Sequence, residues 1–436
     1  MSAPATPEPI FLQNPTRDQL LEAVAWNHRE LFVLQALAAG GEAHQAEGVT
    51  WTYAGPKGES MILFPRLAEA NAGQQLDAIV GYYRERQPEK LVGCWSLDPP
   101  QPPDLEVPLL ARGFQLGWRP CWMWLDLEQM QAVHPWPEGL KVEVLDAADL
   151  PDADNLPYYD ADMAAVQHAI TGLQPRRMWR FAAFLDGRTV GQSTLFLTTG
   201  PLGVAGIYNV GVVPEARNQG IGKAVTIAAC QQALALGCRH ALLNATGERM
   251  YRQIGFDRIG YGWTWWLNVP RLEAHPPTPE QVTLAEAVGR GDQEALAALG
   301  KQTTARTLDM PLPNGMTLLQ LAVHAEQRAA AEWLIAHGAI LDVVSAWDLG
   351  WRERVPQLLA ARPELANQRL GEMQTTPLHV AVERNDIELA RLVLAANPDL
   401  AIEDAVFHAT PLGWARHFQR AEILQLLESS QAPSSG

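Results

Sequence analysis

The residues from Arg217 to Lys223, which read RNQGIGK, combine two glycines with two basic side chains between an apolar run and a helix-forming run. The first turn of a helix has backbone N–H groups without internal partners, and the helix dipole places partial positive charge there. Glycines such as Gly220 and Gly222 let a phosphate come close to those N–H groups. The spacing therefore predicts an anion cradle with Arg217 and Lys223 at its edges. The alternative is a helix that merely begins with flexible glycines.

Two other kinds of phosphate-binding loop are excluded by the residues at one or two required positions. A dinucleotide-binding loop, G-x-G-x-x-G/A, needs a small residue where Val225 stands. A P-loop needs glycine where Arg217 stands and serine or threonine where Ala224 stands. A cradle for a pyrophosphate is the interpretation that remains.

A second stretch with chemical potential is YYDADMAAVQH, which starts at Tyr158. It holds two tyrosines and two aspartates in an otherwise apolar, helix-like run. A cation could sit among these groups. We therefore expect Tyr158, Asp160 and Asp162 to line the pocket of a cationic substrate, the acceptor, and a solvated helix face is the alternative. The histidines lack the spacing of metal ligands, so no metal site is expected.

The composition excludes several classes of protein. Of 436 residues, 47% are hydrophobic and 19% are charged, and the net charge of −16 argues against nucleic acid as a main partner. The segment 141–268 nevertheless balances its acidic and basic residues, so it can bind an anion. No apolar run reaches the roughly 18 residues of a membrane helix, and the start MSAPATPEPI has no signal-peptide pattern. With only four scattered cysteines, we expect a cytoplasmic protein without a membrane partner.

The segment around the cradle is expected to fold as an α+β domain. Runs rich in β-branched, aromatic and leucine residues predict strands at 179–184, 189–197, 205–213, 241–245 and 259–267. Gly187, after Asp186, favours a hairpin between the first two strands. The helix after the cradle has an apolar face and stops at Gly237, and a short helix with Tyr251 ends at Gly255.

Beyond a proline-rich linker, 271–280, the chain is helical and repetitive. The pieces TLLQ, TPLH and TPLG, which start at Thr317, Thr376 and Thr410, each precede an apolar helix-like run. The last two pieces start 34 residues apart, close to the period of about 33 residues that is typical of stacked helical repeats. We therefore expect a solenoid in which each unit buries its apolar face on the next.

Residues 141–268 resemble the GNAT superfamily of acyl-CoA-dependent N-acetyltransferases. The family motif R/Q-x-x-G-x-G/A matches Arg217–Gly222, and MYRQIGF, Met250–Phe256, resembles the tyrosine-bearing helix near the end of that fold. Residues 280–430 resemble ankyrin repeats, although the unit around 345–367 lacks the TPLH turn. The resemblances imply an α+β acetyltransferase fold, a central mixed sheet flanked by helices, followed by an all-α ankyrin solenoid.

The first 130 residues end in LLARGFQLGWRPCWMWLDL, which resembles the tail of another acetyltransferase fold, but they contain no Arg-x-x-Gly-x-Gly. We interpret them as a degenerate GNAT-like half, so that the fold is duplicated as a tandem pseudo-dimer. An unrelated α/β domain is the alternative. A proline-rich stretch, 133–139, marks the boundary between the halves. The predicted domains are 1–135, degenerate; 136–270, catalytic; 271–280, linker; and 281–430, ankyrin repeats.

The resemblance implies acetyl-CoA as co-substrate and assigns roles to single residues. Tyr251 corresponds to the residue that protonates the leaving thiolate, with packing as its alternative role. Asn244 either binds the cofactor arm or satisfies a strand end. The backbone of the strand before the cradle and the cradle itself bind the cofactor in this family. In this chain these positions are Val210, Gly211, Val212, Arg217, Asn218, Gln219, Gly220, Ile221, Gly222 and Lys223.

The general base is the point at which the chain departs from the family. Many relatives use a glutamate on the strand before the loop, but here that strand has Tyr208 and Asn209, which we assign to the acceptor site. The base then acts through water, or is Glu248 or Asp160. We expect an N-acetyltransferase for an amine, either a small molecule or a protein, with an ankyrin array that binds a protein partner or buttresses the enzyme. The rival is a catalytically weakened acetyl-CoA-binding adaptor whose repeats bind the partner.

Overall fold

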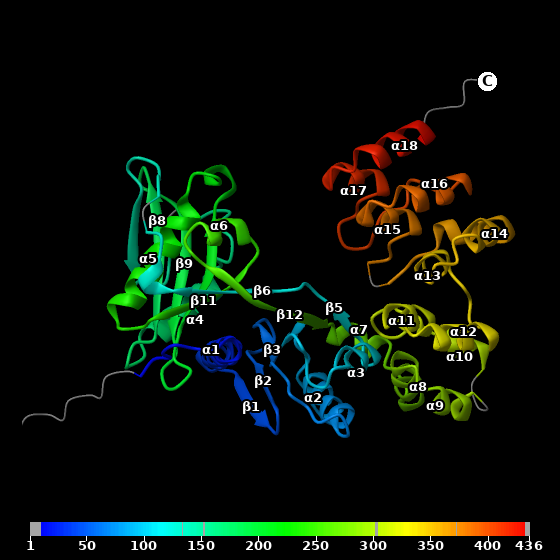
Figure 1. Ribbon diagram of the computed structural model, residues 1–436, viewed down its shortest axis with the longest axis horizontal. Coiled ribbons are helices and arrows are strands. Elements are labelled where there is room, and N and C mark those ends of the chain that lie inside the picture. Colours follow the sequence, from blue (N-terminus) through cyan, green and yellow to red (C-terminus); the bar gives the residue numbers. More distant parts are fainter. Residues whose placement is uncertain (1–9, 133, 151–152, 301–303, 372, 432–436) are drawn as a thin grey trace, which may run out of the picture. The chain divides into compact units, whose positions relative to one another are not determined.

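The computed structural model describes residues 10–132, 134–150, 153–300, 304–371 and 373–431 (Figure 1). Residues 1–9, which we searched for a signal peptide, and Val133, which begins the proline-rich stretch, lie outside these ranges. The chain forms two compact units. Unit 1 contains the described parts of Met1–Pro103 and Leu116–Pro270, and unit 2 contains those of Asp104–Gln115 and Arg271–Gly436.

Unit 1 is built on one mixed sheet with the strand order β1-β2-β3-β4-β12-β6-β11-β10-β9-β8-β7. We call the chain up to residue 135 the first half and residues 136–270 the second half. The strands of the first half are β1 Glu42–Ala46, β2 Val49–Tyr53, β3 Ser60–Leu63, β4 Val92–Leu97, β5 Phe114–Leu116 and β6 Cys121–Asp126. Those of the second half are β7 Lys141–Leu145, β8 Met178–Leu185, β9 Arg188–Leu197, β10 Ala205–Val212, β11 His240–Ala245 and β12 Asp257–Leu267.

The fold predicted for the second half is confirmed. Each of the five strands expected from residue types is present, with ends that move by about two residues or fewer. Asp186 and Gly187, with φ of 51° and 81°, turn the chain between β8 and β9 in the left-handed conformation that such hairpins need. The division into four domains stays a prediction.

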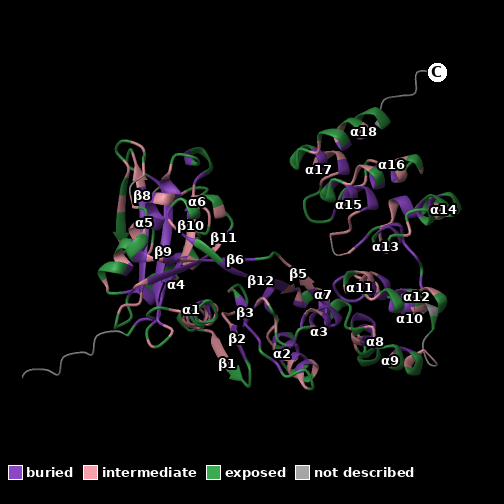
Figure 2. Ribbon diagram, viewed as in Figure 1, coloured by how far each residue is buried: buried purple, intermediate pink, exposed green. Residues whose placement is uncertain are grey.

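Helices cover both faces of the sheet. The helices of unit 1 are α1 Arg17–Ala38, α2 Ala72–Arg86, α4 Ala161–Thr171, α5 Ile221–Ala235 and α6 Glu248–Arg252, and α7 Val269–Ala274 begins at the end of unit 1 and continues into unit 2. Leu31 of α1 and Ile170 of α4 pack with Phe196 of β9, whereas the neighbouring Leu195 packs in the cluster that contains Ile227 of α5. Adjacent strand residues point to opposite faces, so α5 lies across the sheet from α1 and α4. Figure 2 shows the resulting concentration of buried residues along the central strands.

Strand β6 joins the two halves into one sheet. It belongs to the first half, yet it lies between β11 and β12 of the second half and pairs antiparallel with both. Strand β12 is long: it pairs with β6 from Asp257 to Tyr261 and with β4 from Gly262 to Leu267. Each half therefore supplies backbone hydrogen-bond partners to strands of the other half.

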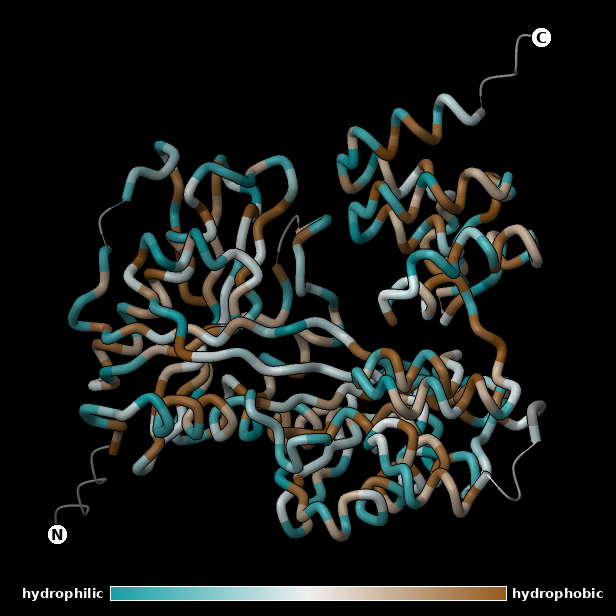
Figure 3. Tube along the Cα trace, turned by 45° about the vertical axis from the view of Figure 1, so that its right-hand side comes forward, coloured by the Kyte–Doolittle hydropathy of each residue, from teal (hydrophilic) through white to brown (hydrophobic). Residues whose placement is uncertain are grey.

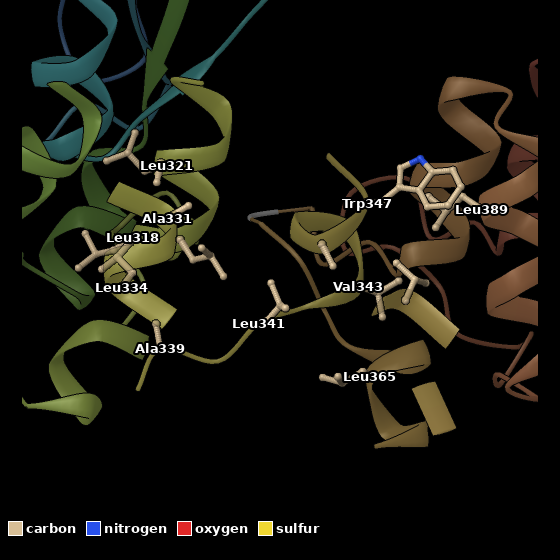
Figure 4. Close-up of a cluster of buried hydrophobic side chains, with 14 of the residues drawn as sticks. Leu318, Leu321, Ala331, Leu334, Ala339, Leu341, Val343, Trp347, Leu365 and Leu389 are labelled. Carbon is tan, nitrogen blue, oxygen red and sulfur yellow. The ribbon is translucent and has the colours of Figure 1, made fainter. Parts of the chain in front are cut away.

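Unit 2 is helical. Its helices are α3 Glu106–Ala111, α8 Pro279–Arg290, α9 Gln293–Leu299, α10 Ala305–Asp309, α11 Leu318–His324, α12 Arg328–Ala336, α13 Val343–Asp348, α14 Arg354–Ala361, α15 Pro377–Arg384, α16 Ile387–Ala395, α17 Pro411–His417 and α18 Ala421–Gln431. Their apolar faces form one cluster, part of which is drawn in Figure 4 with Leu318, Leu334, Val343 and Leu389. Hydrophobic and hydrophilic residues accordingly alternate along these helices (Figure 3).

The repeated threonines of unit 2 start helices, as the repeat pattern predicts. Thr317, Thr376 and Thr410 are the N-caps of α11, α15 and α17. The unit that lacks the TPLH turn uses a buried carboxylate instead: Asp342 accepts hydrogen bonds from the backbone N–H and the hydroxyl of Ser345, at 2.8 and 2.6 Å. An aspartate satisfies the same orphan N–H groups that a threonine would.

Unit 2 also contains a segment of the first half, residues 104–115. Arg112 of this segment forms an ion pair of 2.6 Å with Glu286 of α8, and both side chains are largely buried. Asn314 donates hydrogen bonds to the carbonyl oxygens of Leu110 and Phe114, at 3.1 and 2.8 Å. The chain therefore enters unit 2 twice, once through this segment and once after residue 270. Within the described ranges, no helix has the length and apolar character to cross a bilayer.

His28 of α1 is buried among aromatic rings of both halves of unit 1. These rings belong to Phe32, Phe64, Trp95, Trp122 and Tyr208. Neither ring nitrogen of His28 has a hydrogen-bond partner among the described residues. Burial lowers the pKa of His28 from 6.5 to about 3, because the charged form is poorly solvated there.

We expect this histidine to make unit 1 sensitive to acid. The unfolded chain binds a proton near pH 6.5 and the folded chain does not, so stability is complete above that pH and is lost as the pH falls toward 3. Between pH 6 and 4 the free energy of unfolding should fall by about 1.4 kcal/mol per pH unit from this group. Chemical denaturation of the wild type and of a His28→Phe variant measures it. An equally steep pH dependence in the variant would contradict the assignment.

The insertion of β6 predicts that the second half does not fold alone. A fragment of residues 136–270 leaves β11 and β12 without the strand between them, and we expect it to be aggregated or without a cooperative thermal transition. Co-expression with residues 10–132 should restore soluble protein with a melting transition, measured by circular dichroism. A cooperative transition in the isolated 136–270 fragment would show that β6 is dispensable.

Candidate functional site

The predicted cradle lies at the N-terminus of α5. Gly220 is the N-cap, with φ of 85°, and no side chain caps the helix. Asn218 is also left-handed, with φ of 62°. The loop opens on a cavity of about 700 Å³, which we call the cradle cavity. It is lined by Val212, Ala216, Arg217, Asn218, Gly220, Ile221, Gly222, Lys223, Thr246, Gly247, Glu248, Arg249, Met250 and Gln253.

The charges of the cradle cavity favour an anion. Arg217, Lys223 and Arg249 line it, against one carboxylate, Glu248. That carboxylate is neutralised by Arg252, four residues along α6, at 2.7 Å. Hydrogen bonding to Arg252 lowers the pKa of Glu248, so it stays ionised and paired. Phosphate groups are the anions that uncapped helix N-termini and basic side chains bind together.

The described part of unit 1 contains a parallel strand pair in each half, β3 with β4 and β10 with β11, and the two pairs end differently. In the second half, β10 pairs with β11 only at Ala205 and Gly206. On its other edge, the register of β10 with β9 shifts between Tyr208 and Gly211. Asn209 lies in this irregular stretch with φ of 52°. Beyond Gly206, β10 therefore no longer pairs with β11.

In the first half the corresponding pair stays closed. β3 and β4 are paired along the whole of β3, from Ser60 to Leu63. The N–H of Phe64 then donates to Trp95 and that of Leu67 to Gln101, at 2.8 and 3.1 Å. The described part of the first half thus lacks the glycine loop, and its parallel strands stay paired up to a small cavity of about 50 Å³ at their ends. These features fit the prediction that this half does not bind the cofactor.

Two glycines around the cradle are required by the protein itself. A Cβ on Gly220 would lie 2.9 Å from the carbonyl oxygen of Pro135, in the segment between the halves, and one on Gly211 would lie 2.6 Å from the carbonyl oxygen of Pro157. A Cβ on Gly222 would meet only the sulfur of Met250, at 3.0 Å, and that side chain can move. Gly220 and Gly211 therefore serve chain packing in addition to any ligand, a constraint that the sequence alone did not reveal.

Tyr251 lies on α6, directly after the lining residue Met250, and is only 6% exposed. Burial raises its pKa above the usual value, and the nearby Tyr158 and Cys230 add to the shift. A phenol with a raised pKa keeps its proton at neutral pH and can donate it in a hydrogen bond.

Several of the remaining predicted residues lie outside the cradle cavity. Tyr208 donates a hydrogen bond to Asn27 of α1 at 2.7 Å, so its hydroxyl is held on the α1 face of the sheet. Asn244 lies on β11 opposite Trp122 of β6. Neither residue lines the cradle cavity, and the same is true of Val210, Gly211 and Gln219. Their assignment to substrate or cofactor stays a prediction.

A second cavity, of about 640 Å³, contains two of the predicted acceptor residues. Asp160 and Asp162 line it, and Asp160 is also the N-cap of α4, where it accepts a hydrogen bond of 2.7 Å from the N–H of Met163. Tyr158 is outside this lining and is 58% exposed. The opposite wall comes from the first half and includes Glu59. Sequence reasoning missed that wall because nothing in its local pattern indicates a partner across the fold.

Among the described residues, no group of three or more histidine, cysteine, aspartate or glutamate side chains is arranged to hold a metal ion. The four cysteines, Cys94, Cys121, Cys230 and Cys238, are free and buried.

Comparison with known proteins identifies both regions. Residues 144–256 match the acetyltransferase (GNAT) family, and residues 373–404 match the ankyrin repeat. No curated protein matched the chain.

Solved structures with low sequence identity also match. A GCN5-related N-acetyltransferase from Kribbella flavida is 16% identical, with a TM-score of 0.42, over 56% of this chain and 95% of that chain. A tandem GNAT protein from the clavulanic acid biosynthesis pathway is 15% identical, with a TM-score of 0.41, over 60% and 98%. A GCN5-related N-acetyltransferase from Sphaerobacter thermophilus is 16% identical, with a TM-score of 0.38, over 59% and 97%.

The chain therefore contains a GNAT-family acetyltransferase domain, built on a mixed sheet flanked by helices, and an ankyrin repeat in its helical C-terminal region.

Proposed function

We propose that the chain is an N-acetyltransferase that transfers the acetyl group of acetyl-CoA to an amine. The observation that carries this proposal is the uncapped N-terminus of α5, which opens on a basic cavity at the place where β10 leaves β11. The backbone N–H groups of residues 218–223, with Arg217 and Lys223, would bind the pyrophosphate. The unpaired edge of β10 at Val210–Val212 would bind the pantetheine arm.

The reaction joins the amine nitrogen to the acetyl carbon and breaks the bond from that carbon to sulfur. One proton must leave the amine and one must reach the sulfur. We assign the second task to Tyr251, a buried phenol that keeps its proton at neutral pH and follows Met250, which lines the cradle cavity. Donation to a developing thiolate is a charge-assisted hydrogen bond, which is stronger than a neutral one.

The first proton must come off an ammonium group. An amine with a pKa near 10.4 is neutral at pH 7 at a cost of about 4.6 kcal/mol, and a base or a dry pocket offsets part of this cost. Strand β10 has no carboxylate for the purpose. Glu248 is a poor base because its ion pair with Arg252 lowers its pKa. We therefore favour Asp160, in the second cavity, directly or through water.

One observation favours a second function. The absence of a carboxylate on β10 fits a weakened enzyme that binds acetyl-CoA and signals through its ankyrin repeats. Turnover of acetyl-CoA with any amine separates this adaptor from the enzyme. In either case we propose a protein partner for the ankyrin region and a cytoplasmic location, which the free cysteines fit.

Charge reversal at the cradle tests the cofactor site. Arg217→Glu with Lys223→Glu changes two side chains at the edge of the cradle cavity. Losing two charged contacts should weaken acetyl-CoA binding by about 100-fold or more in calorimetric titration. The matched control, Lys141→Glu with Arg188→Glu, makes the same charge change at exposed sites of β7 and β9 and should leave binding unchanged. Equal binding by both variants and the wild type would place the cofactor elsewhere.

The Tyr251→Phe substitution tests the proton donor. It removes the hydroxyl but keeps the buried ring, so the fold and the affinity for acetyl-CoA should be retained. We expect kcat to fall by about 100-fold or more, with acetyl-CoA affinity within about twofold. Steady-state kinetics with a thiol-release assay measure both. Unchanged kcat would reduce Tyr251 to a packing residue.

A further inference from the structure

The second cavity is built from both halves of unit 1. The second half contributes the start of α4, with Asp160, Asp162 and Met163. The first half contributes the end of α1 and the segments 54–59 and 89–90. The first half, which lacks the glycine loop, thus forms one wall of the second cavity.

The lining of this cavity combines carboxylates with short aliphatic groups. Its acidic residues are Glu59, Glu89, Asp160 and Asp162, against two lysines, Lys57 and Lys90. Its apolar surface comes from Ala38, Ala39, Ala54, Met163, Ala165 and Val166. Desolvation raises the pKa of Glu59; the charge of Lys90 opposes this shift and that of Asp160 adds to it, so the acidic groups of the two halves interact across the cavity. A cation with an aliphatic body would relieve that repulsion.

The cavity lies near the strand that we assign to the cofactor arm. The carbonyl oxygen of Pro157 packs against Gly211 of β10 and accepts a hydrogen bond of 2.7 Å from Gln192. Asp160 is three residues further along, so its Cα lies at most about 11 Å from that of Pro157. The segment that brings Asp160 to the cavity is therefore held against β10 and β9 three residues earlier, at Pro157.

We propose that the second cavity is the acceptor site and that it binds a small aliphatic amine with a second positive charge. This proposal rests on the proposed acetyl transfer for its chemistry, though not for binding itself. The reacting nitrogen must give up its proton and is then neutral. The carboxylates of the cavity that do not act as base therefore need a second positive charge on the ligand as their partner. A volume of about 640 Å³ suits a small molecule, and a diamine-like ligand fits both requirements.

Binding of matched probes to the full-length protein, without acetyl-CoA, tests the site directly. We expect 1,5-diaminopentane to bind in calorimetric titration, while pentane-1,5-diol and glutarate, which have the same length but no positive charge, do not bind. Glu59→Gln with Asp162→Asn should weaken diamine binding by about tenfold or more. The control Glu69→Gln with Glu138→Gln removes two exposed carboxylates outside the cavity and should change nothing. Equal binding of diol and diamine, or no effect of the cavity pair, overturns the proposal.

Two further variants separate charge from shape and from folding. Asp160→Asn keeps a good N-cap for α4 while it removes the charge, so a loss of diamine affinity in this variant is not a folding effect. Ala165→Phe fills the cavity from an exposed position of α4. In kinetic assays with 1,5-diaminopentane, Ala165→Phe should raise KM for the amine by about tenfold and leave acetyl-CoA affinity unchanged.

The outcomes distinguish this proposal from the proposed function. Acetyl-CoA that binds and turns over, with amine KM unaffected by the cavity variants, contradicts the acceptor cavity and leaves the acetyltransferase intact. Diamine that binds in the cavity, with no binding of acetyl-CoA, contradicts the proposed function and leaves a cation-binding cavity.

Discussion

The pairing of β6 between β11 and β12 is the constraint on which the rest of unit 1 depends. Because this strand comes from the first half, the sheet of the second half is complete only when the first half is present. In turn, β12 of the second half pairs with β4 of the first half. The backbone hydrogen bonds of the two halves are therefore satisfied together, and α1 of the first half packs over strands of the second.

Within this shared sheet, the two halves differ in how their parallel strands pair. The second half opens its parallel strands after Gly206 and places an uncapped, glycine-rich helix start at the opening. The first half keeps its parallel strands paired past Leu63 and lacks the loop. The first half also supplies surfaces to its neighbour: the wall around Glu59 and the ring cluster around His28. That this half is a degenerate copy of the acetyltransferase fold stays a prediction.

Features set by local residue types could be predicted from the sequence. The cradle at Arg217–Gly222, the hairpin at Gly187 and the capping threonines of unit 2 follow from glycine, turn and N-cap preferences over a few residues. The insertion of β6 could not be predicted. Its sequence, CWMWLD, has the apolar pattern of any buried strand and does not indicate which strands it pairs with. The second cavity was missed for the same reason. Asp160 was found as a charged residue in an apolar run, but its neighbours across the cavity, such as Glu59, are assembled only by tertiary structure.

Hydrogen–deuterium exchange on the full-length protein, with and without acetyl-CoA, tests the central claim most directly: one sheet, shared by two halves, with one working cradle. We expect the ligand to slow exchange at residues 210–212 and 218–223 and to leave residues 64–72, the corresponding loop of the first half, unchanged. Protection of residues 64–72, or no protection of residues 218–223, would contradict this division of roles between the halves.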